Sequence, residues 1–201
     1  MSRIIFMEKS YSLLASNHLK LIEDLENKKE NFDSVHFDLI DNSFCQGLGL
    51  SILTLEQLAS NTDYVIDVHL LVENPNNILQ RINSLNIRSY TFHSETISSN
   101  EFNKLDITES KKGIALLPQT ELSELKNYLE TANFVLFLCI NPSLFPSGDS
   151  INPVSRVIEF KELFPNFKGG LVVDGGLRED HLQALEDQGV INVVLGKNFF
   201  S

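Results

Sequence analysis

Val35-His36-Phe37-Asp38-Leu39-Ile40-Asp41 is a run of mostly apolar residues in which the polar side chains of His36 and Asp38 stand two positions apart. Side chains alternate between the two faces of a β-strand, so His36 and Asp38 point to one side, and the other side carries Val35, Phe37 and Leu39. The run therefore predicts a strand that carries an imidazole and a carboxylate side by side.

Similar arrangements of polar residues in or after apolar runs recur further along the chain. Asp67 and His69 share a face in the apolar run 64–72, and Asp174 follows the apolar run 170–173. A single histidine or aspartate at the end of a strand is usually a hydrogen-bonded core or capping group. Four of them at the ends of apolar runs instead predict one shared metal or acid–base site, formed by His36, Asp38, His69 and Asp174.

Short apolar runs alternate with longer segments of helical period along the whole chain. Strands are expected at 11–15, 34–40, 65–72, 89–93, 113–117, 134–140, 170–173 and 192–195. Helices are expected at 16–29, 54–60, 75–85, 99–104, 121–131, 153–163 and 179–188. This alternation predicts parallel βαβ units. Eight strands favour a single (β/α)8 barrel domain over residues 1–201, with an open doubly wound sheet as the alternative, and a barrel would place the site at the carboxyl ends of its strands.

Composition and charge restrict the possible partners. The formal net charge is -11, with a pI near 4.8, which argues against nucleic acid because binding it depends on Lys and Arg neutralising phosphates. Cys45 and Cys139 form neither a disulfide framework nor a paired zinc motif. No apolar run approaches the roughly 20 residues needed to cross a bilayer. We therefore expect a cytoplasmic protein without a membrane partner.

The predicted cluster of side chains suggests a class of chemistry. Two imidazoles and two carboxylates suit one divalent metal ion, and Zn, Fe, Mn and Co all accept such ligands. A metal in this setting can polarise a carbonyl and stabilise the enediolate that remains when a neighbouring proton is removed. Two acids on opposite faces of that carbon can take the proton and return one with inverted configuration, which is the mechanism of an epimerase.

Several motifs together resemble the ribulose-phosphate 3-epimerase family over about residues 11–200. They occur in the family's order and spacing: 36–41, 67–72 with Pro75, 91–93 with Glu95, Asn141-Pro142, 173–176 and Gly196. The resemblance implies a (β/α)8 barrel of the ribulose-phosphate-binding type that interconverts ribulose 5-phosphate and xylulose 5-phosphate, while relatives act on allulose 6-phosphate. It also favours a homo-oligomer.

The resemblance also implies roles for individual residues. His36, Asp38, His69 and Asp174 would hold the metal, and Asp38 and Asp174 would be the two catalytic acids. Substrate contacts are implied for Ser12, His69, Gly175, Gly176, Gly196 and Lys197. For Ser12 the alternative is a helix cap, for Lys197 a solvated surface lysine, and for the two adjacent glycines a simple strand-to-helix turn.

The chain departs from the family pattern in the loop that would grip the substrate phosphate. After Asn141-Pro142 the sequence reads Ser143-Leu144-Phe145-Pro146-Ser147-Gly148, so bulky residues and a proline replace glycines. The first hypothesis is a metal-dependent 3-epimerase of a ketose phosphate. The alternative is a catalytically silent barrel that binds a sugar phosphate or a partner protein. A decarboxylase or a tryptophan-pathway enzyme has less support, because no lysine accompanies the strand acids.

Overall fold

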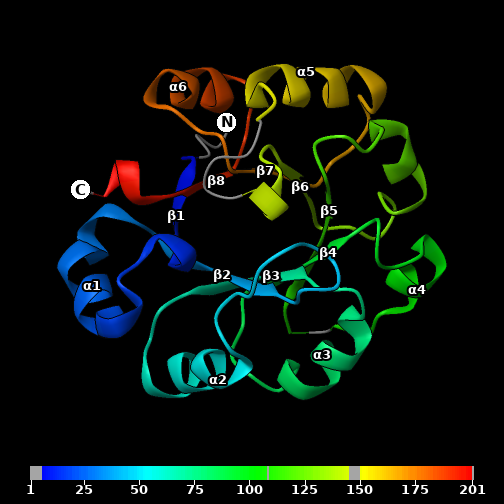
Figure 1. The fold of residues 1–201 in the computed structure, drawn as a ribbon. Helices are drawn as coiled ribbons and strands as arrows, with labels where there is room; N and C mark the ends of the chain where they lie inside the picture. The colour runs from blue at the N-terminus through cyan, green and yellow to red at the C-terminus, as the bar shows by residue number, and fades with distance from the viewer. Residues whose placement is uncertain (1–5, 108, 145–149, 201) are drawn as a thin grey trace.

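The computed structural model describes residues 6–107, 109–144 and 150–200, and within them eight parallel strands close into a barrel (Figure 1). Each strand pairs with its neighbours in sequence order, and β1 pairs with β8. The strands are β1 (Glu8–Ser12), β2 (Ser34–Ile40), β3 (Ile66–Leu71), β4 (Ser89–His93), β5 (Lys111–Leu116), β6 (Phe134–Leu138), β7 (Gly170–Asp174) and β8 (Asn192–Leu195). The predicted (β/α)8 barrel is confirmed.

Helices surround the barrel as an outer ring (Figure 1). The α-helices are α1 (Leu21–Lys28), α2 (Ile52–Asn61), α3 (Pro75–Ile82), α4 (Ser99–Lys104), α5 (Pro153–Leu163) and α6 (Glu179–Asp187). Pro75 and Pro153 each open a helix, where the missing N–H leaves no hydrogen bond unmade. In the part of the chain that the structure describes, no helix is long and apolar enough to span a membrane.

The alternation within each strand separates two apolar regions. Val35, Phe37 and Leu39 of β2 belong to the large core between strands and helices. Inward-facing residues such as Leu136 and Val172 belong to a smaller cluster inside the barrel. Because the outward face is apolar at every second position, the inward positions of β2 are free to carry His36 and Asp38.

The barrel closes where the first strand meets the last. The backbone N–H of Glu8 donates to the carbonyl of Ile191 at 2.9 Å, and four residues of β1 are in register with β8. Behind this seam the rings of Tyr11 and Phe200 lie 4.5 Å apart between centroids. The two ends of the described chain are therefore joined by both the sheet and the core.

A polar network fills the mouth of the barrel at the amino ends of the strands. Arg88 donates from Nε to Asp67 Oδ1 at 2.9 Å, from Nη1 to Glu8 Oε2 at 2.6 Å and from Nη2 to Ser34 Oγ at 3.0 Å. A cavity of about 480 Å³ lies beside this network, lined by Arg88 and Asp67 among others, and it extends up to His36. The active-site end of a barrel is the opposite mouth, so this network has a structural role.

Two sequence expectations about elements were wrong in part. The strand expected at 11–15 is β1 at Glu8–Ser12, followed by a 3-10 turn at Leu13–Ala15. The inward side of β1 is polar, so the strand lacks the apolar run that would have revealed its start. The helix expected at 121–131 is a 3-10 helix, Leu122–Asn127. Its buried residues Leu122 and Leu125 are three positions apart, which matches three residues per turn.

Candidate metal centre

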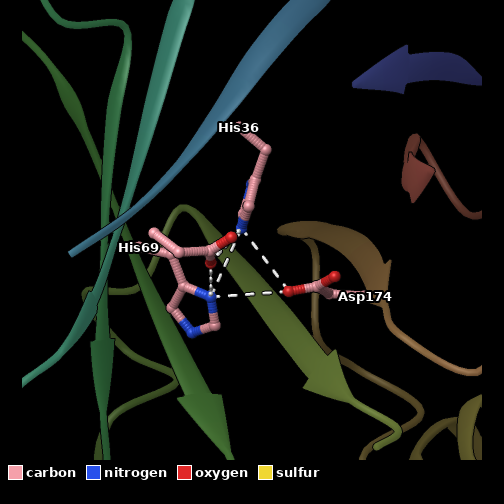
Figure 2. Close-up of side chains that lie close together, drawn as sticks. His36, His69 and Asp174 are labelled. Atoms are coloured by element: carbon pink, nitrogen blue, oxygen red, sulfur yellow. Dashed lines mark hydrogen bonds and ion pairs between the residues drawn. The ribbon is translucent and has the colours of Figure 1, made fainter. Parts of the chain in front are cut away.

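Three strands bring the four predicted metal-site residues to one place inside the barrel. His36 and Asp38 project from β2, His69 from β3, and Asp174 is the last residue of β7. In the ladder between β2 and β3, Asp38 is the direct partner of His69. Figure 2 shows the polar atoms of His36, His69 and Asp174 converging on a common point. The sequence prediction that these side chains meet is correct.

The distances from the two histidine nitrogens to the polar atoms around them are closely similar. Nε2 of His36 and Nδ1 of His69 lie 3.3 Å apart, and Oδ1 of Asp38 lies 3.2 Å from each of these nitrogens. Oδ2 of Asp174 lies 3.5 Å from each of the same nitrogens. One atom from each of the four residues lies within 4.8 Å of all the others.

This spacing matches the edges of a metal coordination shell. A tetrahedral ion with ligand bonds of about 2.0–2.1 Å separates its ligand atoms by about 3.3 Å. The five distances to the histidine nitrogens, between 3.2 and 3.5 Å, agree with that value. Two imidazole nitrogens and two carboxylate oxygens are also ligand types that Zn, Fe, Mn and Co accept. The residues present therefore fit a divalent transition metal.

The electrostatics of the cluster favour positive charge at its centre. Burial by itself would lower the pKa of His36, but the neighbouring carboxylates of Asp38 and Asp174 raise that pKa well above its ordinary value. Burial would raise the pKa of Asp174, yet His36 and His69 hold it well below its ordinary range. Two carboxylates that stay ionised in a buried site need a cation beside them.

A second layer of polar groups supports His69. Its Nε2 lies 2.8 Å from Nε2 of His93, and Nδ1 of His93 lies 3.0 Å from Oε2 of Glu95. Burial lowers the pKa of His93 to about 4, so this ring is neutral. Despite its own burial, Glu95 has its pKa lowered to about 2 by the hydrogen bond with His93, so it is an ionised acceptor.

The structure places the predicted substrate-binding residues around the same mouth. Ser12 caps the 3-10 turn Leu13–Ala15 without a side-chain bond to it, and its hydroxyl instead lies 3.5 Å from Oδ2 of Asp38. Gly175 and Gly176 follow Asp174 with φ of 77° and 67°. A Cβ on Gly175 would lie 2.3 Å from Cγ2 of Ile140, so both the backbone angle and the contact favour glycine.

The other two predicted positions lie at the end of the neighbouring strand. Gly196 follows β8, and Lys197 begins the 3-10 helix Lys197–Phe199 with an exposed side chain. Because Asp174 pairs with Val194, these positions are adjacent to the turn after β7. Of the altered loop Ser143–Gly148, residues 145–148 lie outside the described residues.

Sequence reasoning missed the connection that Glu95 makes. His93 belongs to the motif 91–93 on β4, and its hydrogen-bond partners are the predicted ligand His69 and Glu95. Phe44, in the loop after β2, covers the His93 ring at 4.9 Å between centroids. The only available signal was the spacing of His93 and Glu95, because periodicity gives no information beyond the end of a strand.

Comparison with solved structures supports the fold. The chain superposes on a tryptophan synthase α-subunit from Pyrococcus furiosus with a TM-score of 0.65 and 14% identity, covering 95% of this chain and 86% of that one. It superposes on KGPDC from Streptococcus mutans with a TM-score of 0.64 and 12% identity, covering 96% of this chain and 88% of that one. At these identities the likeness shows a shared barrel only.

Comparison of sequences identifies the family. The chain is 27% identical to ribulose-phosphate 3-epimerase of Helicobacter pylori strain J99 over 96% of this chain and 91% of that protein. It is 29% identical to ribulose-phosphate 3-epimerase of Buchnera aphidicola subsp. Baizongia pistaciae, over 96% and 88%. The model of the ribulose-phosphate 3 epimerase family matches residues 9–200. The chain therefore belongs to the ribulose-phosphate 3-epimerase family of enzymes.

Proposed function

We propose that the protein is a metal-dependent 3-epimerase of a ketose phosphate, of the ribulose 5-phosphate and xylulose 5-phosphate type. One observation carries the proposal: four side chains from β2, β3 and β7 offer nitrogen and carboxylate ligand atoms within 4.8 Å of one another. His36, Asp38, His69 and Asp174 would hold the ion. When bound, the metal polarises the substrate carbonyl and stabilises negative charge that develops on its oxygen.

The two acids carry the proton transfers. One carboxylate removes the proton from the carbon next to the carbonyl, and the electron pair of that C–H bond becomes part of an enediolate. The other carboxyl group, which must hold a proton at this stage, donates it to the opposite face of the same carbon. Asp38 and Asp174 suit these roles because they come from β2 and β7, two strands that are not neighbours in the barrel.

The phosphate group of the substrate would be bound at the turns after β7 and β8. Barrels of this fold commonly bind phosphate at these two loops. Gly175 and Gly176 let the backbone approach an anion closely, and Lys197 adds an exposed cation beside Gly196. Ser12 and His69 complete the proposed set of substrate contacts.

Metal content and proton exchange test the proposal together. We expect elemental analysis to find one divalent metal ion per chain. We also expect the metal-loaded protein to incorporate solvent deuterium at C3 of ribulose 5-phosphate or allulose 6-phosphate. Because an ion that binds only the folded state stabilises it, stripping the metal should also lower the midpoint of thermal unfolding. Bound metal without exchange on any ketose phosphate would instead support a catalytically silent relative.

A further inference from the structure

The contact between His69 and His93 is a directed hydrogen bond between two ring edges. Their planes differ by 14° and their centroids are 5.0 Å apart, while the two Nε2 atoms are separated by 2.8 Å. Nearly coplanar rings at this separation face each other nitrogen to nitrogen. Both side chains are fully buried. One of the two nitrogens must therefore carry the proton and the other must accept it.

Glu95 is held so that only one of its oxygens faces this pair. Its Oε1 accepts the backbone N–H of Leu117 at 2.8 Å and the hydroxyl of Thr120. Its Oε2 lies 3.0 Å from Nδ1 of His93. An ionised carboxylate can only accept hydrogen bonds, so Nδ1 of His93 must be a donor.

The positions of the protons follow from this geometry. A neutral His93 with its proton on Nδ1 has a lone pair on Nε2, which can only accept. His69 must then donate from Nε2, so its Nδ1, which faces Asp38 and Asp174, is the nitrogen left to bind a metal. We propose that Glu95 is a positioning residue that fixes the tautomers of His93 and His69 and so keeps Nδ1 of His69 free to bind the metal. This inference rests on the proposed metal centre.

Glu95→Gln tests the proposal with almost no change in shape. The amide oxygen should take the place of Oε1, because Leu117 N–H and the Thr120 hydroxyl both donate to that position. The amide NH2 would then face Nδ1 of His93 and reverse the chain of protons. His93 would carry its proton on Nε2, and His69 would carry its proton on Nδ1, where it blocks a metal.

Two measurements detect this reversal of the proton positions. In histidine-labelled protein, long-range ¹H–¹⁵N spectra of the metal-free form report which nitrogen of His93 is protonated, without any need for metal. We expect Nδ1 in the wild type and Nε2 in Glu95→Gln. Competition with a chromogenic chelator gives zinc affinity, which we expect to be about 10- to 100-fold weaker in Glu95→Gln.

Thr120→Val is the matched control. It removes a donor to Oε1 but leaves the carboxylate facing His93, so both the His93 tautomer and the zinc affinity should stay close to the wild type. Should Glu95 serve only to tie the loop after β4 to the loop after β5, the two variants would behave alike.

The outcomes separate this inference from the proposed function. A wild-type His93 protonated on Nε2 would overturn the inference whether or not the variants fold, as would wild-type zinc affinity in Glu95→Gln. A wild type that binds no zinc or other divalent metal would overturn the proposed function, while the His93 tautomer would still report on Glu95.

Discussion

Asp38 and Asp174 approach the same nitrogen from different strands: Oδ1 of Asp38 lies 3.2 Å and Oδ2 of Asp174 lies 3.5 Å from Nε2 of His36. Both carboxyl groups therefore border the volume in which a metal and a substrate carbonyl would meet. If the two acids serve opposite faces of one carbon, the two single substitutions should differ in which epimer still exchanges its proton with solvent.

We expect Asp38→Asn and Asp174→Asn each to lower net epimerisation by about 10²- to 10⁴-fold, because an amide cannot transfer the proton. Each variant should still exchange solvent deuterium into the one epimer whose proton faces the remaining acid. The measurement is NMR of deuterium incorporation from each pure epimer at saturating metal, with bound metal quantified in each variant.

Asp41→Asn is the control for these two variants. Asp41 lies just beyond β2, outside the four-residue cluster, and accepts the backbone N–H groups of Ser43, Phe44 and Glu73 at 3.0, 2.8 and 2.9 Å. We expect it to keep epimerase activity. Equal exchange of both epimers by both aspartate variants would contradict the assignment of one acid to each face.

Asp24 should make stability depend on pH. Burial favours the protonated carboxyl, but hydrogen bonds from Lys28 at 2.5 Å and Tyr11 at 2.8 Å outweigh it and hold the pKa of Asp24 below its ordinary value. The folded protein therefore binds this proton less readily than the unfolded chain, in which the pKa of an aspartate is about 3.9. The stabilisation is present above that value and disappears as pH falls through the folded pKa.

At neutral pH, Asp24→Asn should lower the free energy of unfolding by about 1 to 2 kcal/mol. Urea unfolding at neutral and acidic pH should show this difference shrinking as the pH falls. Glu23→Gln, which removes an exposed ion pair with Lys20, should change stability by less than about 1 kcal/mol. If the difference in the free energy of unfolding between the wild type and Asp24→Asn grew as the pH fell, Asp24 would not have the lowered pKa that we assign to it.

Arg88 should contribute more to stability than a surface arginine does. Asp67 is only 7% exposed, and removal of Arg88 would leave its carboxylate buried with hydroxyl donors but no cation. We expect Arg88→Ala to cost about 2 to 4 kcal/mol in the free energy of unfolding, because an uncompensated buried charge is strongly destabilising.

Arg81→Ala offers a close comparison. Arg81 also binds a carboxylate through two nitrogens, at 2.8 and 3.1 Å to Glu56, but it does so at the surface. Its loss should destabilise the protein less than the loss of Arg88 does, because exposed ion pairs contribute little to stability. Equal losses in chemical denaturation of the two variants would mean that the network at the amino-terminal mouth is no stronger than a surface ion pair.

The metal-site residues could be predicted because they follow strand periodicity. His36 and Asp38 stand two positions apart in an apolar run, and Asp174 closes another, so alternation and the parallel order of the strands suffice to bring them together. Their spacing did not have to be known, because the barrel imposes it.

The residues that support the site could not be found in that way. Glu95 lies past the end of β4, and Arg88 lies just before its start. At both positions the hydrogen-bond partners come from neighbouring strands and loops. The start of β1 was misplaced for the same reason, because Glu8 and Ser10 face a polar mouth that exists only once the barrel has closed. Local sequence does not contain that information.

The pairing of β1 with β8 also constrains how the protein can be synthesised. β1 leaves the ribosome long before the residues of β8 are made, so a nascent barrel has an open sheet with an unpaired edge. The residues on that edge include Glu8 and Lys9, whose charges oppose pairing with another nascent chain. These charges discourage aggregation through the open edge of the first strand, and the barrel can close only after β8 has been synthesised.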